Sequence, residues 1–328
     1  MPDTTPADWR SGATPAVLRR RAALIGAARG FFADRGVLEV DTPIVVNAPV
    51  SDVHIHSARV TFCAESDREP APFYLHTSPE YAMKRLLAGG SGDIYQICHV
   101  VRGLERGRLH NAEFTLIEWY RTGWSLETLM DEVDALVRTL LGARAQGRSS
   151  LRLSYREAFT QQLGIDPFSA SLQELTGAAR AAGFAGTPGG RDELLELLMS
   201  VRIGPQLGRE ALTFVYGYPA SQAALARLDP RDERAAQRFE LYGEGVELAN
   251  GFHELADADE QRARFEHDNA ERRRLGLPIA PIDERLLAAL AAGLPDCCGV
   301  ALGFDRLVML CERAERIDEV MPFPTERA

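Results

Sequence analysis

The loop between residues 102 and 111 holds a dense group of side chains that could bind a polyphosphate. It follows an apolar run rich in β-branched residues, Ile94 to Val101, and precedes an alternating run that ends at Tyr120, so the pattern predicts two strands joined by a charged loop. Guanidinium groups and hydrogen-bond donors gathered in one loop suit phosphate oxygens. A solvated hairpin loop has a similar composition, and the loop alone does not decide between the two. Its polar residues are Arg102, Glu105, Arg106, Arg108, His110 and Asn111.

The second of these strands carries polar groups on a face that is otherwise apolar. Alternation places Glu118 and Tyr120 on the face that begins with Phe114. Because burying an unpaired carboxylate costs several kcal/mol, we expect this face to line a cavity with polar contents.

A second polar cluster lies between residues 238 and 255. Two carboxylates such as Glu240 and Glu247 can meet across a pair of antiparallel strands, and one or two carboxylates plus phosphate oxygens are typical ligands of Mg²⁺. The dipeptide Asn250-Gly251 is also a strong turn signal, which is the alternative interpretation of this segment. A turn does not explain why Glu240, Glu247 and Glu254 crowd a glycine-rich, otherwise apolar region.

Two strand-to-helix junctions add further candidates. Ser78, Pro79 and Glu80 precede a helix, where free backbone N–H groups and a carboxylate can both face a ligand, although helix capping alone would explain Ser78 and Glu80. Near the C-terminus, Gly303 allows close approach of the backbone, and Arg306 on the first helical turn could stack on a purine or pair with a phosphate.

Composition narrows the class of protein. The 328 residues have a formal net charge of −10 and a pI of about 5.3, whereas domains that grip nucleic acid backbones usually show a basic excess. No apolar run approaches the ~20 residues of a membrane span, and the first residues lack the apolar core of a signal peptide. The five cysteines are odd in number and show no CxxC pairing. We therefore expect a cytoplasmic protein with reduced thiols and no membrane contact.

The order of elements predicts one domain over residues 14–328. Residues 1–13 are expected to be flexible, and a helix is expected from Pro15 to about Asp34, followed by a short strand. Another helix is expected over residues 125–142. Residues from about 145 to 210 read as a helical insertion, with a capping box at Ser171 and Glu174, and a strand follows from Leu212 to Pro219.

Taken in order, the clusters resemble the three signature motifs of class II aminoacyl-tRNA synthetases. Motif one would be the helix and strand that end at Thr42-Pro43, motif two the Arg102–Tyr120 hairpin, and motif three the segment Gly303 to Arg306. The chain looks most like the lysyl-tRNA synthetase core and its truncated relatives, the elongation factor P–(R)-β-lysine ligases. The similar segments are TSPEYAMKRLLAGG, GRLHNAEFTLIEWYR, ELANGFHEL and GVALGFDRLVML.

The resemblance implies an α+β fold, with a six- or seven-stranded antiparallel sheet flanked by helices and a homodimer formed through motif one. It also implies residue roles. Arg102 and Arg306 would be catalytic, and Glu240 and Glu247 would hold Mg²⁺. ATP would be bound by Arg102, Gly103, Leu104, His110, Asn111, Phe114, Glu247, Leu248, Gly303 and Arg306, and the amino acid by Ser78, Pro79, Glu80, Tyr120, Asn250, Glu254 and Ala301.

The activity implied is formation of an aminoacyl-adenylate from ATP and (R)-β-lysine, followed by transfer to a lysine of elongation factor P. Only about 13 residues precede the first helix, too few for an anticodon-binding domain, so we expect a protein acceptor and no tRNA binding. Ala301 stands where lysyl-tRNA synthetases usually have glycine, consistent with a β-amino acid.

The chain also departs from the family pattern. In motif two, Leu104 replaces a glutamate, Val101 a phenylalanine and Ala112 a proline. Glu105 could substitute for the missing carboxylate through a one-residue shift of the loop. Two other interpretations therefore remain: a synthetase-like enzyme that activates another amino acid, such as L-lysine, for tRNA or another amine acceptor, and a non-catalytic protein that keeps the fold.

Overall fold

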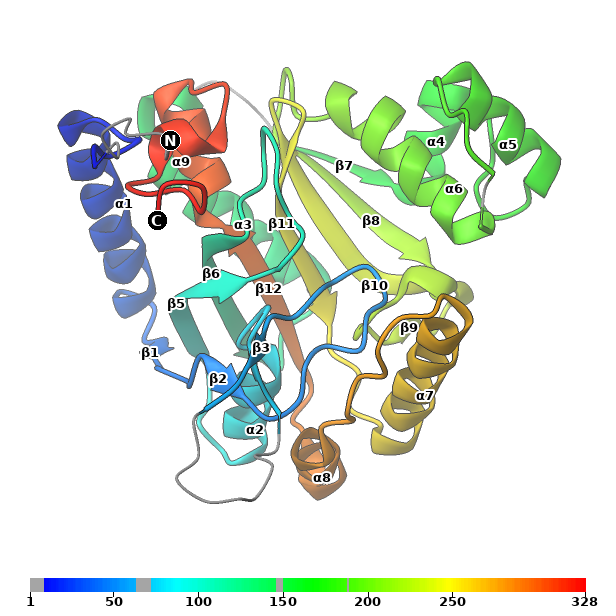
Figure 1. Ribbon diagram of the computed structural model, residues 1–328, viewed down its shortest axis with the longest axis horizontal. Helices are drawn as coiled ribbons and strands as arrows, with labels where there is room; N and C mark the ends of the chain where they lie inside the picture. The colour runs from blue at the N-terminus through cyan, green and yellow to red at the C-terminus, as the bar shows by residue number, and fades with distance from the viewer. Residues whose placement is uncertain (1–8, 63–71, 146–149, 188) are drawn as a thin grey trace, which may run out of the picture.

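A nine-stranded sheet forms the centre of the computed structural model, which describes residues 9–62, 72–145, 150–187 and 189–328 (Figure 1). Six central strands run antiparallel, and the edge strands β1 and β7 pair in parallel with their neighbours. The predicted α+β class is confirmed, with short parallel edges added to the expected antiparallel sheet. In sheet order the strands are β1 (Leu38–Glu39), β5 (Ile94–Val101), β6 (Glu113–Thr122), β12 (Cys297–Gly303), β11 (Val246–His253), β10 (Asp232–Gly243), β8 (Thr213–Pro219) and β7 (Leu151–Ser154), while β9 (Leu228–Asp229) pairs with β10.

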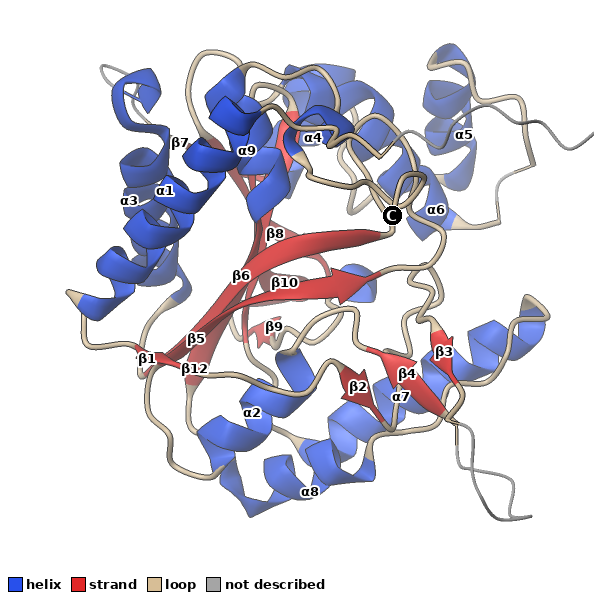
Figure 2. Ribbon diagram, turned by 60° about the vertical axis from the view of Figure 1, so that its left-hand side comes forward, coloured by secondary structure: helices blue, strands red, loops and turns tan. Residues whose placement is uncertain are grey.

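One face of this sheet is apolar and covered by helices α1 (Pro15–Ala33), α3 (Leu126–Leu141) and α9 (Phe304–Glu312) (Figure 2). Alternate residues of the strands, such as Ile117, Trp119 and Val300, supply the apolar layer from the sheet side. The predicted boundaries of α1 and α3 are confirmed. Since side chains alternate along a strand, the intervening residues must occupy the opposite face, where the polar groups lie.

The opposite face is bordered by helices α2 (Glu80–Ala88), α7 (Ala258–Arg274) and α8 (Glu284–Gly293), and by a small sheet of order β2 (Val45–Val46), β4 (Phe73–Leu75), β3 (Arg59–Val60) (Figure 2). Met83 and Leu87 of α2 pack with Leu286 and Leu290 of α8 and with Tyr120 of β6. This second core fixes α2 against the sheet. Within the described residues, every helix is too short or too polar to cross a membrane.

The segment predicted as an insertion forms a lobe beside β7 and β8, at the β7 edge of the sheet (Figure 1). Helices α4 (Tyr155–Leu163), α5 (Leu172–Ala181) and α6 (Arg191–Leu198) share a core with β8. The capping box of Ser171 and Glu174 is confirmed. The insertion differs from the prediction at its start, because β7 belongs to the main sheet, and residues 146–149 and 188 lie outside the described ranges, as do residues 1–8 of the expected flexible start. Short helical turns occupy Gly142–Ala145 (η1), Met199–Ile203, Gly204–Gln206, Ala220–Gln222 and Ile317–Val320.

A buried ion cluster ties α3 to the central hairpin. Glu132 of α3 accepts hydrogen bonds from Trp119 Nε1 at 3.0 Å and from Arg121 Nε at 2.9 Å. Arg121 also pairs with Asp93 at 2.9 Å, just before β5. Because Arg121 and Glu132 are both buried, loss of either partner leaves the other charge uncompensated.

We expect Glu132→Ala to lower the free energy of unfolding by about 3 kcal/mol, since it leaves the Arg121 guanidinium and the Trp119 N–H short of a partner. Urea unfolding followed by circular dichroism measures the change. The matched control is Glu127→Ala on the exposed face of the same helix, for which we expect a loss of about 1 kcal/mol or less. Equal losses in the two variants would contradict a stabilising role for the cluster.

Candidate active site

A row of side chains crosses five strands on the uncovered face of the sheet. The strand registers place Gln96 opposite Glu118, Glu118 opposite Ala301, Ala301 opposite Asn250, and Asn250 opposite Glu240. Directly opposed residues on neighbouring strands lie on one face. The row therefore brings motif two, motif three and the 238–255 cluster together, as their sequence patterns predicted.

Glu118 is a buried carboxyl group that accepts two hydrogen bonds. Its Oε2 accepts from Ser78 Oγ at 2.8 Å and its Oε1 from Tyr120 Oη at 2.8 Å. The Ser78 hydroxyl in turn accepts from the N–H of Glu80 at 3.0 Å. Burial, helped by the nearby charge of Glu80, raises the pKa of Glu118 to about 7. The polar groups expected on this face are present as a buried hydrogen-bonded cluster around Glu118, and the cavity that they would line stays a prediction.

A lysine lies between two of the predicted substrate-binding acids. Lys84 Nζ is 2.6 Å from Glu80 Oε1 and 2.6 Å from Glu254 Oε2. Burial alone would lower the pKa of Lys84, but the charges of Glu254 and Glu80 outweigh it and raise that pKa. Burial, together with the nearby Glu80 and Glu118, raises the pKa of Glu254 to about 8 despite the pairing with Lys84. Three carboxylates and one ammonium thus share a closed space.

Gly299 leaves room for this arrangement. It pairs with Tyr120 on β6, and a Cβ at this position would overlap both the Tyr120 ring and Glu254 Oε1. Contacts this close do not occur for real side chains, so any larger residue must displace one of them. The lack of a side chain at 299 is therefore a condition for Tyr120 and Glu254 to meet.

At the other end of the row, Arg306 joins three segments. Its Nη1 donates to Glu247 O at 3.0 Å, its Nε to Leu109 O at 3.3 Å, and its Nη2 lies 2.8 Å from His110 Nε2. Burial and the adjacent Arg306 charge lower the pKa of His110, so a neutral imidazole accepts from the guanidinium. The Arg306 side chain thus links motif three to the motif-two loop. The phosphate-binding role of this guanidinium stays a prediction.

The backbones of Gly303 and Leu248 lie close together. A Cβ at position 303 would lie 3.7 Å from Leu248 O and 3.7 Å from Arg306 Cδ. Leu248 is the residue skipped in the β10–β11 register, and its side chain is buried in the core. The prediction that these two residues close a nucleotide pocket with their backbones is compatible with this placement.

The motif-two departure has a visible outcome. The Leu104 side chain is exposed, whereas Glu105 Oε1 lies 3.4 Å from Arg102 Nη1. Arg102 also donates to Thr77 O at 3.3 Å and lies over the Phe114 ring, 5.1 Å from its centroid. The arginine therefore has a carboxylate partner one position later than the family pattern places it.

Gly103 and Asn111, two other predicted nucleotide-binding residues, make hydrogen bonds within the chain. The Gly103 N–H donates to His56 O at 2.7 Å, so it fixes the loop. The Asn111 Nδ2 donates to Glu113 O at 2.6 Å and its Oδ1 accepts from the Thr325 N–H at 3.0 Å, so Asn111 holds the C-terminal segment against the loop. The amide keeps a second N–H and a second oxygen lone pair, and its contact with ATP stays a prediction. Pro79 is the N-cap of α2 and makes no side-chain capping bond.

Glu240 and Glu247 share one face of the β10–β11 hairpin, but Asn250, not Glu247, is directly opposite Glu240. Glu240 accepts from Arg238 Nη2 at 2.5 Å and from Tyr242 Oη at 2.6 Å. Glu247 keeps 40% of its side chain exposed, and burial of the rest together with the Glu240 charge raises its pKa. The described residues contain no group of three or more acids, histidines or cysteines placed to hold a metal. Since Mg²⁺ needs only one or two carboxylates beside phosphate and water, the pair fits a Mg²⁺ shared with a nucleotide.

The expected alternative of a turn at Asn250-Gly251 is wrong. Both residues lie inside β11, and the hairpin turns at Glu244 and Gly245, both of which have positive φ.

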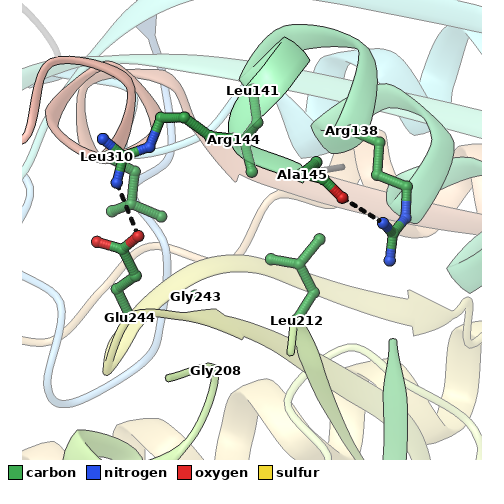
Figure 3. A pocket seen from close by; sticks show the side chains of 9 residues that line it. All are labelled: Arg138, Leu141, Arg144, Ala145, Gly208, Leu212, Gly243, Glu244 and Leu310. Carbon is green, nitrogen blue, oxygen red and sulfur yellow. Dashed lines mark hydrogen bonds and ion pairs between the residues drawn. The ribbon is translucent and has the colours of Figure 1, made fainter. Parts of the chain in front are cut away.

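A hollow on the helix-covered side of the sheet is a poor candidate for a site (Figure 3). Its walls include Leu141, Leu212 and Leu310, and its charged groups bind within the chain. Arg144 pairs with Glu244 at 2.8 Å, and Arg138 donates to Ala145 O at 3.2 Å. The hollow is a gap where α3 and η1 pack against the ends of the strands.

Comparison with known proteins agrees with this geometry. Residues 4–327 match the family model described as tRNA synthetases class II (D, K and N). The chain belongs to this class II synthetase family. Among curated relatives, proteins named elongation factor P–(R)-β-lysine ligase from Edwardsiella ictaluri, Proteus mirabilis and Yersinia enterocolitica are each 50% identical over 98% of this chain and 99% of their own length.

Three residues of this cluster received no role from the sequence. Glu118 was recognised as an unusual acid in a buried strand but received no role, and Lys84 was overlooked. The signals for Lys84 were available: it lies four residues after Glu80 on one helix, where side chains meet, and it is the only lysine in the class II synthetase-like chain. Arg238, which binds Glu240, also became visible only through the strand register.

For Glu105→Gln we expect amino-acid-dependent ATP–pyrophosphate exchange to fall about three- to tenfold, because Arg102 loses a partly exposed ionic partner. For Leu104→Ala, whose side chain is exposed, we expect a change of less than about twofold. Steady-state exchange assays on both variants make the comparison. A larger effect at Leu104 than at Glu105 would show that Glu105 has not taken over the missing carboxylate.

Proposed function

We propose that the protein is an ATP-dependent ligase that activates (R)-β-lysine as an adenylate and transfers it to a lysine side chain of elongation factor P. The observation that carries the proposal is the largely buried acidic cluster of Glu80, Glu118 and Glu254, which suits ammonium groups. Arg102 over Phe114 and Arg306 beside Gly303 lie along the same strands, β6 and β12. Relatives that carry the ligase name along their whole length support the same choice.

The chemistry needs positioning more than acid–base catalysis. A substrate carboxylate is ionised at neutral pH, so its oxygen can attack the α-phosphorus of ATP directly while the bond to pyrophosphate breaks. Arg102 would bind that carboxylate and the α-phosphate, His110 and Asn111 would contact the ATP phosphates, and Arg306 would sandwich adenine with Phe114. An uncharged lysine amine of the acceptor then attacks the carbonyl carbon of the adenylate, AMP leaves, and an amide forms. Mg²⁺, held by Glu247 with Glu240 behind it, would supply further charge neutralisation on the phosphates.

Ala301 supports a β-amino acid as the substrate. Its methyl group lies between Glu118 and Asn250 in the row that crosses the sheet, at the floor of the pocket. A methyl group there shifts the substrate backbone relative to the acids, and one methyl typically changes binding by about 1–3 kcal/mol. The alternative substrate with the same two ammonium groups is L-lysine, the choice that would favour tRNA as acceptor.

The proposal includes a cytoplasmic homodimer formed through motif one. Leu38 and Ile44, on either side of the Thr42-Pro43 segment, are 55% and 41% exposed, and a partner subunit would cover them. The described cysteines, Cys98, Cys297, Cys298 and Cys311, are free thiols, which suits a reducing compartment.

The decisive experiment is ATP–pyrophosphate exchange with (R)-β-lysine, L-lysine and a panel of other amino acids, followed by transfer to elongation factor P. We expect the highest kcat/KM with (R)-β-lysine and a mass increase of one residue on the acceptor. Exchange driven better by L-lysine, with transfer to tRNA, would replace the proposal with the synthetase alternative. A folded protein without exchange would exclude both.

The pH profile provides a second test. With the pKa of Glu118 raised to about 7 and that of Glu254 to about 8, these acids become protonated in the free enzyme as the pH falls through this range. We expect kcat/KM for the diamino acid to level off above about pH 8, to fall about tenfold per pH unit between about 8 and 7, and to fall about a hundredfold per unit below about 7, where both acids are protonated, because kcat/KM reports groups of the free enzyme. The KM for ATP serves as the control. A flat profile between pH 6 and 8.5 would contradict the assignment.

A further inference from the structure

Lys84 is unusual in composition as well as in place. The sequence contains 37 basic residues, and 36 of them are arginine. The one lysine is fully buried, on the inner side of α2, while its neighbour Arg85 is exposed. A chain that uses arginine everywhere else has kept an ammonium group at this one point, which indicates that the point requires one.

The geometry explains this requirement. An ammonium is a compact charge with donors in several directions, whereas a guanidinium is a planar fork that needs more room. Lys84 Nζ reaches Glu80 Oε1 and Glu254 Oε2 at 2.6 Å each, and the side chains of Lys84 and Glu254 are both 1% exposed. Each glutamate therefore uses one oxygen for Lys84, and the other oxygen of Glu254 lies over Gly299 beside Tyr120.

The charges in the pocket can be counted. Glu80, Glu118 and Glu254 contribute −3 when ionised and Lys84 contributes +1, which leaves −2. A diamino acid brings two ammonium groups, and its carboxylate belongs to the Arg102 end of the site. The two ammonium charges then balance the −2 of the pocket. A pocket of any other net charge, or a substrate with a different number of ammonium groups, would leave a buried charge without compensation.

We propose that Lys84 is a positioning residue that acts as a fixed internal counter-ion: it orients Glu80 and Glu254 and sets the pocket charge to match a substrate with two ammonium groups. The inference rests on the proposed function and deepens it, because it states which charge class of amino acid the site accepts. Lys84 contacts the two glutamates and does not itself react.

The test uses charge restoration. Lys84→Met makes the pocket −3, Glu80→Gln makes it −1, and the double variant returns it to −2. Arg85→Met, which removes a positive charge one residue away on the exposed side, is the matched control. Each variant is assayed by exchange with (R)-β-lysine and with 3-aminohexanoate, which lacks the distant ammonium, and with L-lysine and L-norleucine as the corresponding α-amino acids. Calorimetry measures Kd for the same compounds without turnover.

We expect each single variant to lower kcat/KM for the diamino acid at least about 30-fold, mainly through KM, with the KM for ATP changed less than about threefold. The double variant should be at least about fivefold better than either single variant, since its charge is balanced again. Glu80→Gln should also shift the preference at least about tenfold toward the mono-ammonium compound. Arg85→Met should match the wild type.

A double variant as weak as the weaker single variant, or weaker, would overturn the proposal, because the charge balance would then restore nothing and independent losses of contacts add. Unchanged kcat/KM in Lys84→Met would overturn it as well. If Lys84→Met does not fold, the Glu80→Gln preference decides: no shift toward the mono-ammonium compound refutes the charge count. A wild type that neither binds nor activates either diamino acid refutes the proposed function itself, whereas binding without restoration in the double variant refutes only the role of Lys84.

Discussion

The cost of burying charge on one face of a β-sheet governs this structure. The opposite face satisfies the usual rule, with Trp119, Ile117 and Val300 packed under helices. On the uncovered face, the acids of the site have ion-pair or hydrogen-bond partners within the chain. Lys84 pairs with Glu80 and Glu254, Ser78 and Tyr120 donate to Glu118, and Arg238 and Tyr242 donate to Glu240. Because an uncompensated buried charge is so unfavourable, these partners determine which helices and strands must be adjacent. The position of α2, which brings Ser78, Glu80 and Lys84 to the sheet, follows from this requirement.

The two ends of the site differ in sign. Around α2 the groups are mainly carboxylates, whereas around the motif-two loop and α9 the guanidinium groups of Arg102 and Arg306 lie with their partners Glu105 and Glu247 and a neutral His110. A bound molecule with ammonium groups at one end and phosphates at the other can therefore lie in only one direction. Such a field, built from fixed side chains, orients reactants before any covalent step and requires little rearrangement during the reaction.

Much of this arrangement was predictable from alternation and spacing. The hairpin, the polar face begun by Phe114 and the junctions before α2 and α9 follow local rules, and the family resemblance set their order. What failed depended on non-local geometry. The turn at Glu244 and Gly245 places Glu247 opposite Tyr242, and the skipped residue Leu248 then brings Asn250 opposite Glu240. No local pattern announces such a bulge. Asn250-Gly251 has the composition of a turn, yet sheet pairing on both sides keeps it extended. The hydrogen bond from the Thr325 N–H to Asn111 Oδ1 joins residues more than 200 positions apart, and spacing alone cannot reveal it.

The composition around Lys84 has a consequence for chemical self-protection. A mixed anhydride of an amino acid acylates any uncharged primary amine that it meets, and an enzyme that makes one is exposed to its own product. Lys84 carries the only side-chain primary amine in this sequence, and the α-amino group of the N-terminus is the other primary amine. Lys84 is buried and is kept protonated by two carboxylates. Arginine side chains stay charged and are poor nucleophiles. Toward the adenylate that we propose, the chain therefore presents no uncharged side-chain amine, and the amine that reacts must come from another molecule.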